Sequence, residues 1–226
     1  MENHVKQIMR SYGADVCGIA GIEGFAAAPA GFSPTDIYRG CKSVIVFGIA
    51  LPMGLTDVDS RLVYGYYNSF ICTEVDRVAL QGAKALERAF RAKAVPMPCD
   101  NPYEYWEPET LTGRGLISMK HAAVMGGLGR LGKNSLLLNP EYGNLLAVGA
   151  VLFELELQPD ELCEDICIET CRKCIDACPV QAISNGRVNQ LSCRHNTYGK
   201  TSRGFDTVDC NSCRTVCPMR YGKHIT

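Results

Sequence analysis

The placement of cysteine limits the possible folds of this chain more than any other feature. Two runs share one design, a series of closely spaced cysteines that ends in Cys-Pro. Their members are Cys167, Cys171, Cys174 and Cys178 before Pro179, and Cys210, Cys213 and Cys217 before Pro218, with Cys193 upstream. A compact centre with four thiolates takes three from one tight loop, and the proline then turns the chain away. The fourth thiolate must come from elsewhere, so the sequence predicts two neighbouring thiolate centres.

This spacing is similar to that of bacterial two-cluster ferredoxins, in which the last cysteine of one run binds the cluster of the other run. The similarity predicts two 4Fe–4S clusters. One takes Cys167, Cys171, Cys174 and Cys217, and the other takes Cys193, Cys210, Cys213 and Cys178. The first run departs from the common spacing, since Ile168 stands where cysteine is usual. Cys163 therefore competes with Cys167 for that ligand position.

Zinc and disulfides are two other uses of closely spaced cysteines. Zinc knuckles contain Cys-x2-Cys pairs, but they do not need a third cysteine and a proline in both halves. Disulfide frameworks belong to oxidising compartments. The N-terminal segment MENHVKQIMRSYG is charged and contains no apolar signal segment, so a cytoplasmic location is expected. The remaining cysteines are expected to be small buried residues: Cys17, Cys41, Cys72 and Cys99.

Composition narrows the classes of partner. The chain has 226 residues, is 46% hydrophobic and has a net charge of −1. Nucleic-acid binding usually requires clustered Lys and Arg, so no nucleic-acid partner is expected. No apolar run approaches the roughly 20 residues of a membrane helix, so no membrane partner is expected either.

Patterning before the cysteine-rich part indicates a layered α/β or α+β domain. We expect helices at 5–12, at 68–93 with Asn68 as the cap, and at 115–125. Strands are expected at 16–22, 43–51 and 145–157; the second is almost uniformly apolar and therefore central. The predicted domains are 1–158, which binds a cofactor or partner, and 159–226, which holds both clusters.

A glycine-rich segment at 126–135, GGLGRLGKNS, lies between these two parts. Gly127, Gly129 and Gly132 match the spacing of a dinucleotide fingerprint, but that motif should follow a strand and here follows a predicted helix. One alternative is a tight turn from helix to strand, in which glycine supplies positive φ. The other is a backbone that approaches a flat cofactor, with Lys133, Asn134 and Ser135 as hydrogen-bond donors.

The segment GLGRLGKNSLLLNPEYG, together with the cysteine runs and isolated Cys193, resembles epoxyqueuosine reductases. The segments DVCGIA and KSVIVFGIAL are similar too and occur in the same order. The resemblance implies a nitroreductase-like α/β domain that binds cobalamin, followed by a ferredoxin-like module with two 4Fe–4S clusters. Corrinoid-dependent reductive dehalogenases share this arrangement of clusters and corrinoid. FMN is a weaker alternative to cobalamin as the cofactor. The cofactor-binding candidates are then Gly127, Gly129, Gly132, Lys133, Asn134 and Ser135.

The chain departs from these reductases where they carry an acid that donates a proton. The matching stretch, 111–118, contains no acid, and Arg130 replaces a tryptophan of the glycine segment. Glu107 and His121 are the candidates for the missing proton donor. The chain also ends soon after the second cysteine run, without the helical repeats that hold tRNA in longer members. A substrate other than tRNA is therefore expected.

These features predict an iron–sulfur oxidoreductase that takes electrons from a donor protein or low-potential reductant. It would pass them to a cobalamin or small substrate at the N-terminal domain. The alternative is a non-enzymatic electron carrier or activator of a corrinoid protein. Two aromatic groups could line the cofactor pocket: Tyr64, Tyr66 and Tyr67, and Tyr103, Tyr105 and Trp106. Arg194 and Lys200 could donate hydrogen bonds to cluster sulfurs.

Overall fold

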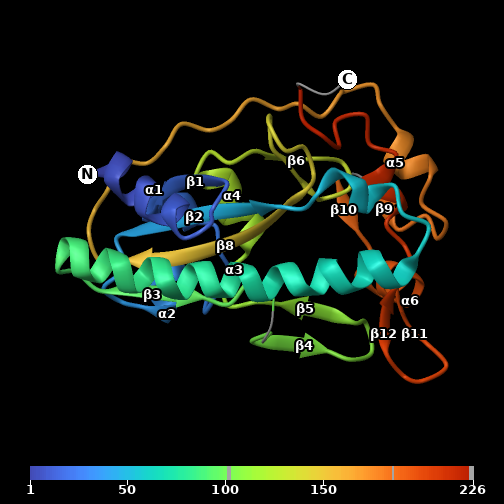
Figure 1. Ribbon diagram of the computed structural model, residues 1–226, viewed down its shortest axis with the longest axis horizontal. Helices are drawn as coiled ribbons and strands as arrows, with labels where there is room; N and C mark the ends of the chain where they lie inside the picture. Colours follow the sequence, from blue (N-terminus) through green and yellow to red (C-terminus); the bar gives the residue numbers. More distant parts are fainter. Residues whose placement is uncertain (101–102, 185, 224–226) are drawn as a thin grey trace.

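The computed structural model describes residues 1–100, 103–184 and 186–223. Its N-terminal part is built on an antiparallel sheet with the strand order β1-β2-β8-β3. These strands are β1 (Val16–Gly21), β2 (Ser43–Ala50), β8 (Leu146–Phe153) and β3 (Ala94–Met97). Strand β2 is central, as predicted, and pairs with β8 over its whole length, with Val46 opposite Ala150. Figure 1 shows the sheet in the half of the molecule that contains the N-terminus.

Helices cover both faces of the sheet, which explains why β2 is apolar at every position after Ser43. On one face, Ile45 and Phe47 pack against α1 (Glu2–Ser11) and α3 (Arg61–Phe90). On the other face, Val44 and Val46 pack against α4 (Met119–Met125). The mixed α/β content and layered arrangement predicted from the sequence are therefore present.

Helix α3 is the longest element and passes beside both halves of the molecule (Figure 1). It begins at Arg61, so the prediction that Asn68 caps it was wrong. The first turns are held by tertiary contacts that periodicity does not reveal. Tyr64 is buried with Leu51 and Leu145, and Gly65 lies against Val208 of the C-terminal part.

Other predicted boundaries were also wrong, among them one end of α4 and one end of β8. Helix α4 begins only at Met119, after the N-cap Ser118, rather than at 115. Strand β8 ends at Phe153 rather than at 157. The chain after β8 stays attached to the sheet by a hydrogen bond, which the Leu157 amide donates to Ser43 Oγ over 2.9 Å. Alternating polarity at 154–157 therefore reflects a segment anchored to the sheet rather than a paired strand.

The connections in the N-terminal half contain several short elements. These are η1 (Ile22–Phe25), α2 (Pro34–Ile37), η2 (Met53–Thr56), β4 (Tyr105–Glu107), β5 (Thr112–Arg114), β6 (Arg130–Leu131) and β7 (Leu137–Leu138). Strands β4 and β5 form one hairpin, and β6 and β7 form another. The second hairpin contains the end of the glycine-rich segment and projects it toward the cysteine-rich part.

The cysteine-rich part consists of short elements around two loops. They are α5 (Lys173–Asp176), β9 (Ile183–Ser184), β10 (Arg187–Val188), α6 (Gln190–Thr197), β11 (Tyr198–Lys200), β12 (Asp206–Val208) and α7 (Ser212–Thr215). Helices α5 and α7 contact each other, and each contains a middle cysteine of its run, Cys174 or Cys213. The two cysteine runs therefore lie side by side. A domain boundary between 158 and 159 remains a prediction.

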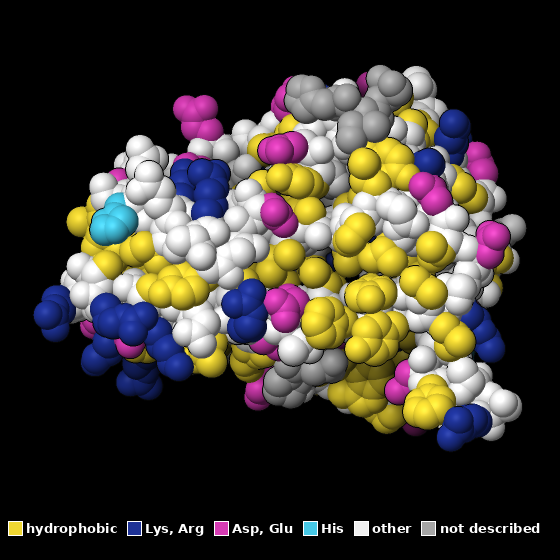
Figure 2. Space-filling view, in the orientation of Figure 1, with side chains coloured by type: hydrophobic (Ala, Val, Ile, Leu, Met, Phe, Trp, Pro, Cys, Tyr) yellow, Lys and Arg dark blue, Asp and Glu magenta, His cyan; other side chains and the backbone are white. Residues whose placement is uncertain are grey.

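Hydrophobic side chains gather on the surface over the N-terminal half of α3 (Figure 2). The exposed large side chains of this region are Leu62, Val63, Tyr66, Tyr67 and Phe70. None of the helices in the described ranges has the length and apolar character needed to cross a membrane.

Candidate iron–sulfur site

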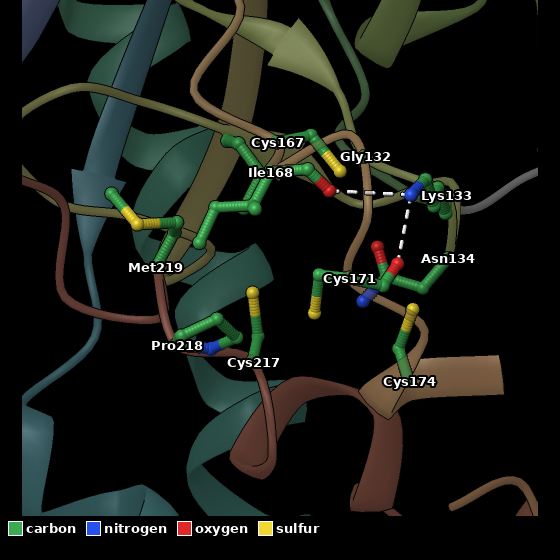
Figure 3. Close-up of a pocket in the computed structure, with 11 residues that line it drawn as sticks. Gly132, Lys133, Asn134, Cys167, Ile168, Cys171, Cys174, Cys217, Pro218 and Met219 are labelled. Carbon is green, nitrogen blue, oxygen red and sulfur yellow. Dashed lines mark hydrogen bonds between the residues drawn. The ribbon is translucent and has the colours of Figure 1, made fainter. Parts of the chain in front are cut away.

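Cysteines from both runs line one cavity in the C-terminal half (Figure 3). Cys167, Cys171 and Cys174 come from the first run, and Cys217 comes from the second. All four side chains are partly buried. They are the four residues that the sequence assigns to one cluster.

The thiols of this group are close enough that a negative charge on one raises the pKa of another. Burial raises the pKa of Cys217, and negative charge on Cys167, Cys174 and Cys171 raises it further. Burial also raises the pKa of Cys174, again with a contribution from Cys167 and Cys171. Thiolates crowded in this way repel each other unless a positive group neutralises them. Soft sulfur donors around one cavity fit an iron–sulfur cluster, which Cys thiolates bind.

A second group of cysteines surrounds Cys213 on α7. Burial, together with the nearby charges of Cys193 and Cys210, raises the pKa of Cys213 to about 11. Cys174 of the first group contributes as well, so the two groups are neighbours. Cys178 Sγ accepts a hydrogen bond from the Ala182 amide over 3.2 Å. Over the ranges that the structure describes, no three His, Cys, Asp or Glu side chains are arranged to hold a single metal ion.

Cys163 lies apart from the cavity. Its thiol donates a hydrogen bond to the Gly127 carbonyl oxygen, with a distance of 2.9 Å. Burial and the neighbouring Glu164 carboxylate raise its pKa. The structure therefore places Cys167, and not Cys163, beside Cys171.

Polar residues of the glycine-rich segment hold the two cysteine loops (Figure 3). Lys133 Nζ donates to the carbonyl oxygens of Ile168 at 3.2 Å and Cys171 at 2.7 Å, and also to that of Glu169. Asn134, which is 5% exposed, donates from Nδ2 to the Cys213 carbonyl oxygen over 2.9 Å. One short segment therefore fixes the backbone of both cysteine runs.

Ser135 completes this contact, since its hydroxyl donates to the Gly186 carbonyl oxygen over 2.9 Å. The sequence suggested that Lys133, Asn134 and Ser135 donate to a flat cofactor. In the structure their side chains donate to the backbone of the cysteine-rich part.

The glycines of the segment allow close backbone contacts. Gly127 has φ +71°, and a Cβ atom there would lie 2.4 Å from the Glu161 carbonyl oxygen. A Cβ at Gly129 would lie 2.3 Å from the Leu138 carbonyl oxygen. Any larger residue would displace these neighbours. Gly132, next to Lys133, also borders the cysteine cavity.

The two candidate proton donors lie outside the residues that line the cysteine cavity. The exposed His121 ring is hydrogen bonded through Nδ1 to Ser118 Oγ at 2.7 Å. Glu107 is on strand β4, and its carboxylate accepts from the Glu109 amide at 3.2 Å.

The aromatic candidates do not form one wall. Tyr64 is buried, whereas Tyr66 and Tyr67 are exposed on α3. Tyr103 and Trp106 stack on each other with 5.7 Å between ring centroids. Tyr105, between them in the sequence, is 44% exposed and lies under the Arg114 guanidinium.

The two basic candidates also have other partners. The Arg194 guanidinium lies 5.1 Å from the Trp106 ring centroid. Lys200 forms an ion pair with Asp206. The described contacts therefore give both residues roles in packing and surface pairing.

Sequence reasoning missed two residues that join the halves, Asn144 and Arg214. Asn144 Nδ2 donates to the Arg214 carbonyl oxygen over 3.1 Å, and Arg214 Nη1 donates to the Asn144 carbonyl oxygen. Arg214 lies between Cys213 and Cys217, so this exchange anchors the second run. An isolated Asn and a loop Arg carry no motif, and nothing in their spacing could have paired them.

Fold and site together define a mixed α/β chain with a cysteine-lined centre at one end. No family model matches the chain. Among curated proteins, epoxyqueuosine reductase of Bacillus subtilis (strain 168) is 32% identical over 125 residues, which cover 51% of this chain and 32% of that protein. Epoxyqueuosine reductase of Lactococcus garvieae is 33% identical over 112 residues, 44% of this chain and 31% of that protein. The matches thus span about a third of each relative.

Solved structures with the same fold include a selenomethionine-labelled epoxyqueuosine reductase. Its TM-score is 0.68 at 20% identity, with 99% of this chain and 67% of that chain covered. The structure of a reductive dehalogenase, described as suggesting a mechanism for B12-dependent dehalogenation, has a TM-score of 0.66 at 18% identity. The match covers 98% of this chain and 32% of that chain. The resemblance to epoxyqueuosine reductases predicted from the sequence is therefore confirmed.

One solved neighbour opposes an expectation about partners. An epoxyqueuosine reductase bound to a modified tRNA-Tyr stem loop has a TM-score of 0.68 at 19% identity, with 99% of this chain and 67% of that chain covered. That protein binds a nucleic acid. The expectation that this chain has no nucleic-acid partner is therefore not supported by its neighbours.

Proposed function

We propose that this chain is an iron–sulfur oxidoreductase that holds two 4Fe–4S clusters in its C-terminal half. The observation that carries the proposal is the cavity shared by Cys167, Cys171, Cys174 and Cys217, which brings cysteines of both runs together. Cys193, Cys210, Cys213 and Cys178 would hold the second cluster. When bound, such clusters supply one-electron transfer.

The chain's own residues would orient the cluster loops and tune their charge. Lys133 Nζ lies beside the first loop and holds three of its backbone carbonyls. A nearby cation favours the more negative, reduced form of a cluster. Asn134 would hold the second loop in the same frame.

We propose that the acceptor is a corrinoid or small substrate on the N-terminal domain. Support for a corrinoid comes from the sequence resemblance and from the B12-dependent neighbour. The side chains of Lys133, Asn134 and Ser135 are engaged elsewhere, so they do not supply its binding site. FMN remains the weaker alternative, and a nitroreductase-like origin of the sheet domain is part of the same proposal.

The second candidate is an electron carrier or reductive activator of a corrinoid protein. It is favoured by Ile168, which borders the cysteine cavity and is 45% exposed. A cluster beneath such a surface residue would be accessible to a partner protein. The partners of either candidate include an electron donor protein or a low-potential reductant.

Anaerobic purification followed by iron analysis tests the cluster proposal. We expect about eight iron atoms per chain and visible absorption that dithionite bleaches. Cobalamin and FMN are then added separately to the loaded protein. Tight uptake of either one supports an enzyme, and uptake of neither supports the carrier. Colourless protein that contains zinc would contradict both candidates.

Cys163 and Cys167 offer a matched pair of variants. We expect Cys167→Ser to lose about half of the iron, because it removes a ligand of one of two clusters. Cys163→Ser should keep the wild-type iron content, because this thiol faces Gly127. The opposite result would place Cys163 in the cluster.

A further inference from the structure

Two cysteines outside both cluster groups face each other in the N-terminal half. Cys72 lies on α3, and Cys99 follows strand β3. Their thiols are close enough that each one shifts the pKa of the other. Both residues are free and partly exposed. Nothing in the sequence pairs them, because Cys72 lies in the predicted helix at 68–93 and Cys99 lies in no predicted element.

The backbone of this region holds the pair together. The Asp76 carboxylate accepts a hydrogen bond from the Cys99 amide over 2.8 Å. Asp76 is one helical turn after Cys72, so both project from the same face of α3. The Cys99 thiol also contacts the Val148 carbonyl oxygen at 3.5 Å. These contacts place Cys99 over Cys72 independently of the thiol charges.

The two thiols have different chemical roles. The hydrogen bond from Cys99 lowers the pKa of Cys72, against the effect of burial. The same bond raises the pKa of Cys99, with burial and the negative charge of Cys72 acting in the same direction. Asp76 and Asp100 also raise both pKa values. Cys72 is therefore the better nucleophile, and Cys99 keeps its proton.

We propose that Cys72 and Cys99 form a reversible disulfide when the protein meets a low-molecular-weight disulfide such as oxidised glutathione. The Cys72 thiolate attacks one sulfur of the small disulfide and releases one thiol. Cys99 then loses its proton and displaces the second thiol from Cys72. The protein thiols lose two protons and two electrons, and the small disulfide gains them as two thiols.

Such a bond would join α3 to the segment that leads into the β4–β5 hairpin. Trp106 of that hairpin lies under Arg194, which is adjacent to Cys193 on α6. The bond would therefore lie six residues before a hairpin that touches the cysteine-rich part. This inference does not depend on the proposed function, because neither thiol is a proposed cluster ligand.

Peptide mapping tests the proposal on the intact, anaerobically purified protein. After treatment with oxidised glutathione, free thiols are alkylated and the protein is digested with trypsin. Cys72 and Cys99 then lie in separate peptides, 62–77 and 94–114. We expect a linked peptide that dithiothreitol removes, and about a tenfold loss of both alkylated peptides. Separate alkylated peptides, or glutathione on each cysteine, would overturn the proposal.

Single variants test the order of attack. Cys99→Ser should trap glutathione on Cys72, whereas Cys72→Ser should leave Cys99 largely alkylated. Cys41→Ser, at a buried cysteine elsewhere in the fold, should still form the linked peptide. Glutathione on Cys99 in the Cys72→Ser protein would contradict the assigned nucleophile. Oxidation should also raise the unfolding midpoint of the wild type and of neither single variant, since a cross-link restricts the unfolded chain.

Discussion

Lys133 connects the glycine-rich segment to the first cysteine loop. Its Nζ donates hydrogen bonds to the carbonyl oxygens of Ile168, Glu169 and Cys171. Backbone carbonyls that lose their partners cost free energy. A single lysine can therefore determine whether three closely spaced cysteines point into one cavity.

Replacement of this lysine should weaken the first cluster group selectively. We expect Lys133→Met to lower the free energy of unfolding by about 1–2 kcal/mol, a value reduced for partial solvent exposure. About half of the iron should be lost, while spectra of the second cluster persist. Iron analysis and electron paramagnetic resonance measure this. Lys84→Met, at an exposed lysine on α3, is the control and should retain full iron.

Among individual residues, the sequence predicted which cysteines belong together, but it did not predict where the Lys133 side chain points. The ferredoxin-like spacing predicted the group Cys167, Cys171, Cys174 and Cys217, with Cys163 as the alternative to Cys167. The direction of Lys133 was not accessible, because a glycine-rich turn followed by Lys fits a cofactor cradle and a loop anchor equally well. Only the position of the C-terminal half relates this side chain to Ile168 and Cys171.

Helix α3 is the element that joins the sheet to the cysteine-rich half. Its middle and C-terminal turns pack under the sheet through Val75 and Leu86. Its first turns pack against β12, where Gly65 permits close approach. A Cβ atom at Gly65 would lie 2.9 Å from the Val208 amide nitrogen.

A glycine-to-alanine change at this position of the helix should therefore lower the free energy of unfolding, although such changes inside helices usually raise it. Alanine is favoured over glycine inside a helix by about 1 kcal/mol. We nevertheless expect Gly65→Ala to destabilise the protein by about 1–3 kcal/mol, because the backbone of β12 must move. Chemical denaturation measures the effect. Gly54→Ala, where a Cβ would meet open space, should change stability little. Stabilisation by Gly65→Ala would show that the contact is not tight.

Three of the four strands of the sheet were easier to predict than the helix ends, whereas β3 was missed. Strand β2 is apolar at every position after Ser43, so its central place follows from hydrophobicity. The start of α3 could not be found in this way, because Leu62, Tyr66 and Tyr67 are exposed and break the expected pattern. The first turns are stabilised by contacts with residues far away in the sequence.

For the whole molecule, the cysteine loops and the sheet domain should unfold as coupled parts. Asn134 and Asn144 connect the sheet side to the Cys213 and Arg214 carbonyl oxygens. A Cβ at Gly143, where φ is +57°, would lie 2.2 Å from Arg220. Order in the cysteine loops is therefore transmitted to the sheet domain by polar contacts and close backbone packing.

Removal of iron should consequently lower the stability of the entire chain. We expect anaerobic chelation to reduce the midpoint of the main unfolding transition, because bound metal stabilises only the folded state. Differential scanning calorimetry of loaded and stripped protein measures this shift. An unchanged sheet-domain transition would indicate that the two parts unfold independently.

The continuity of α3 also bears on electron tunnelling. A helix of 30 residues is about 45 Å long and has no break along its course. It packs against both the sheet and β12. Tunnelling rates fall steeply as the gap between donor and acceptor widens. A redox group bound on the sheet would thus lie at a nearly constant distance from the cysteine-rich half. Electron transfer between them would need no domain motion.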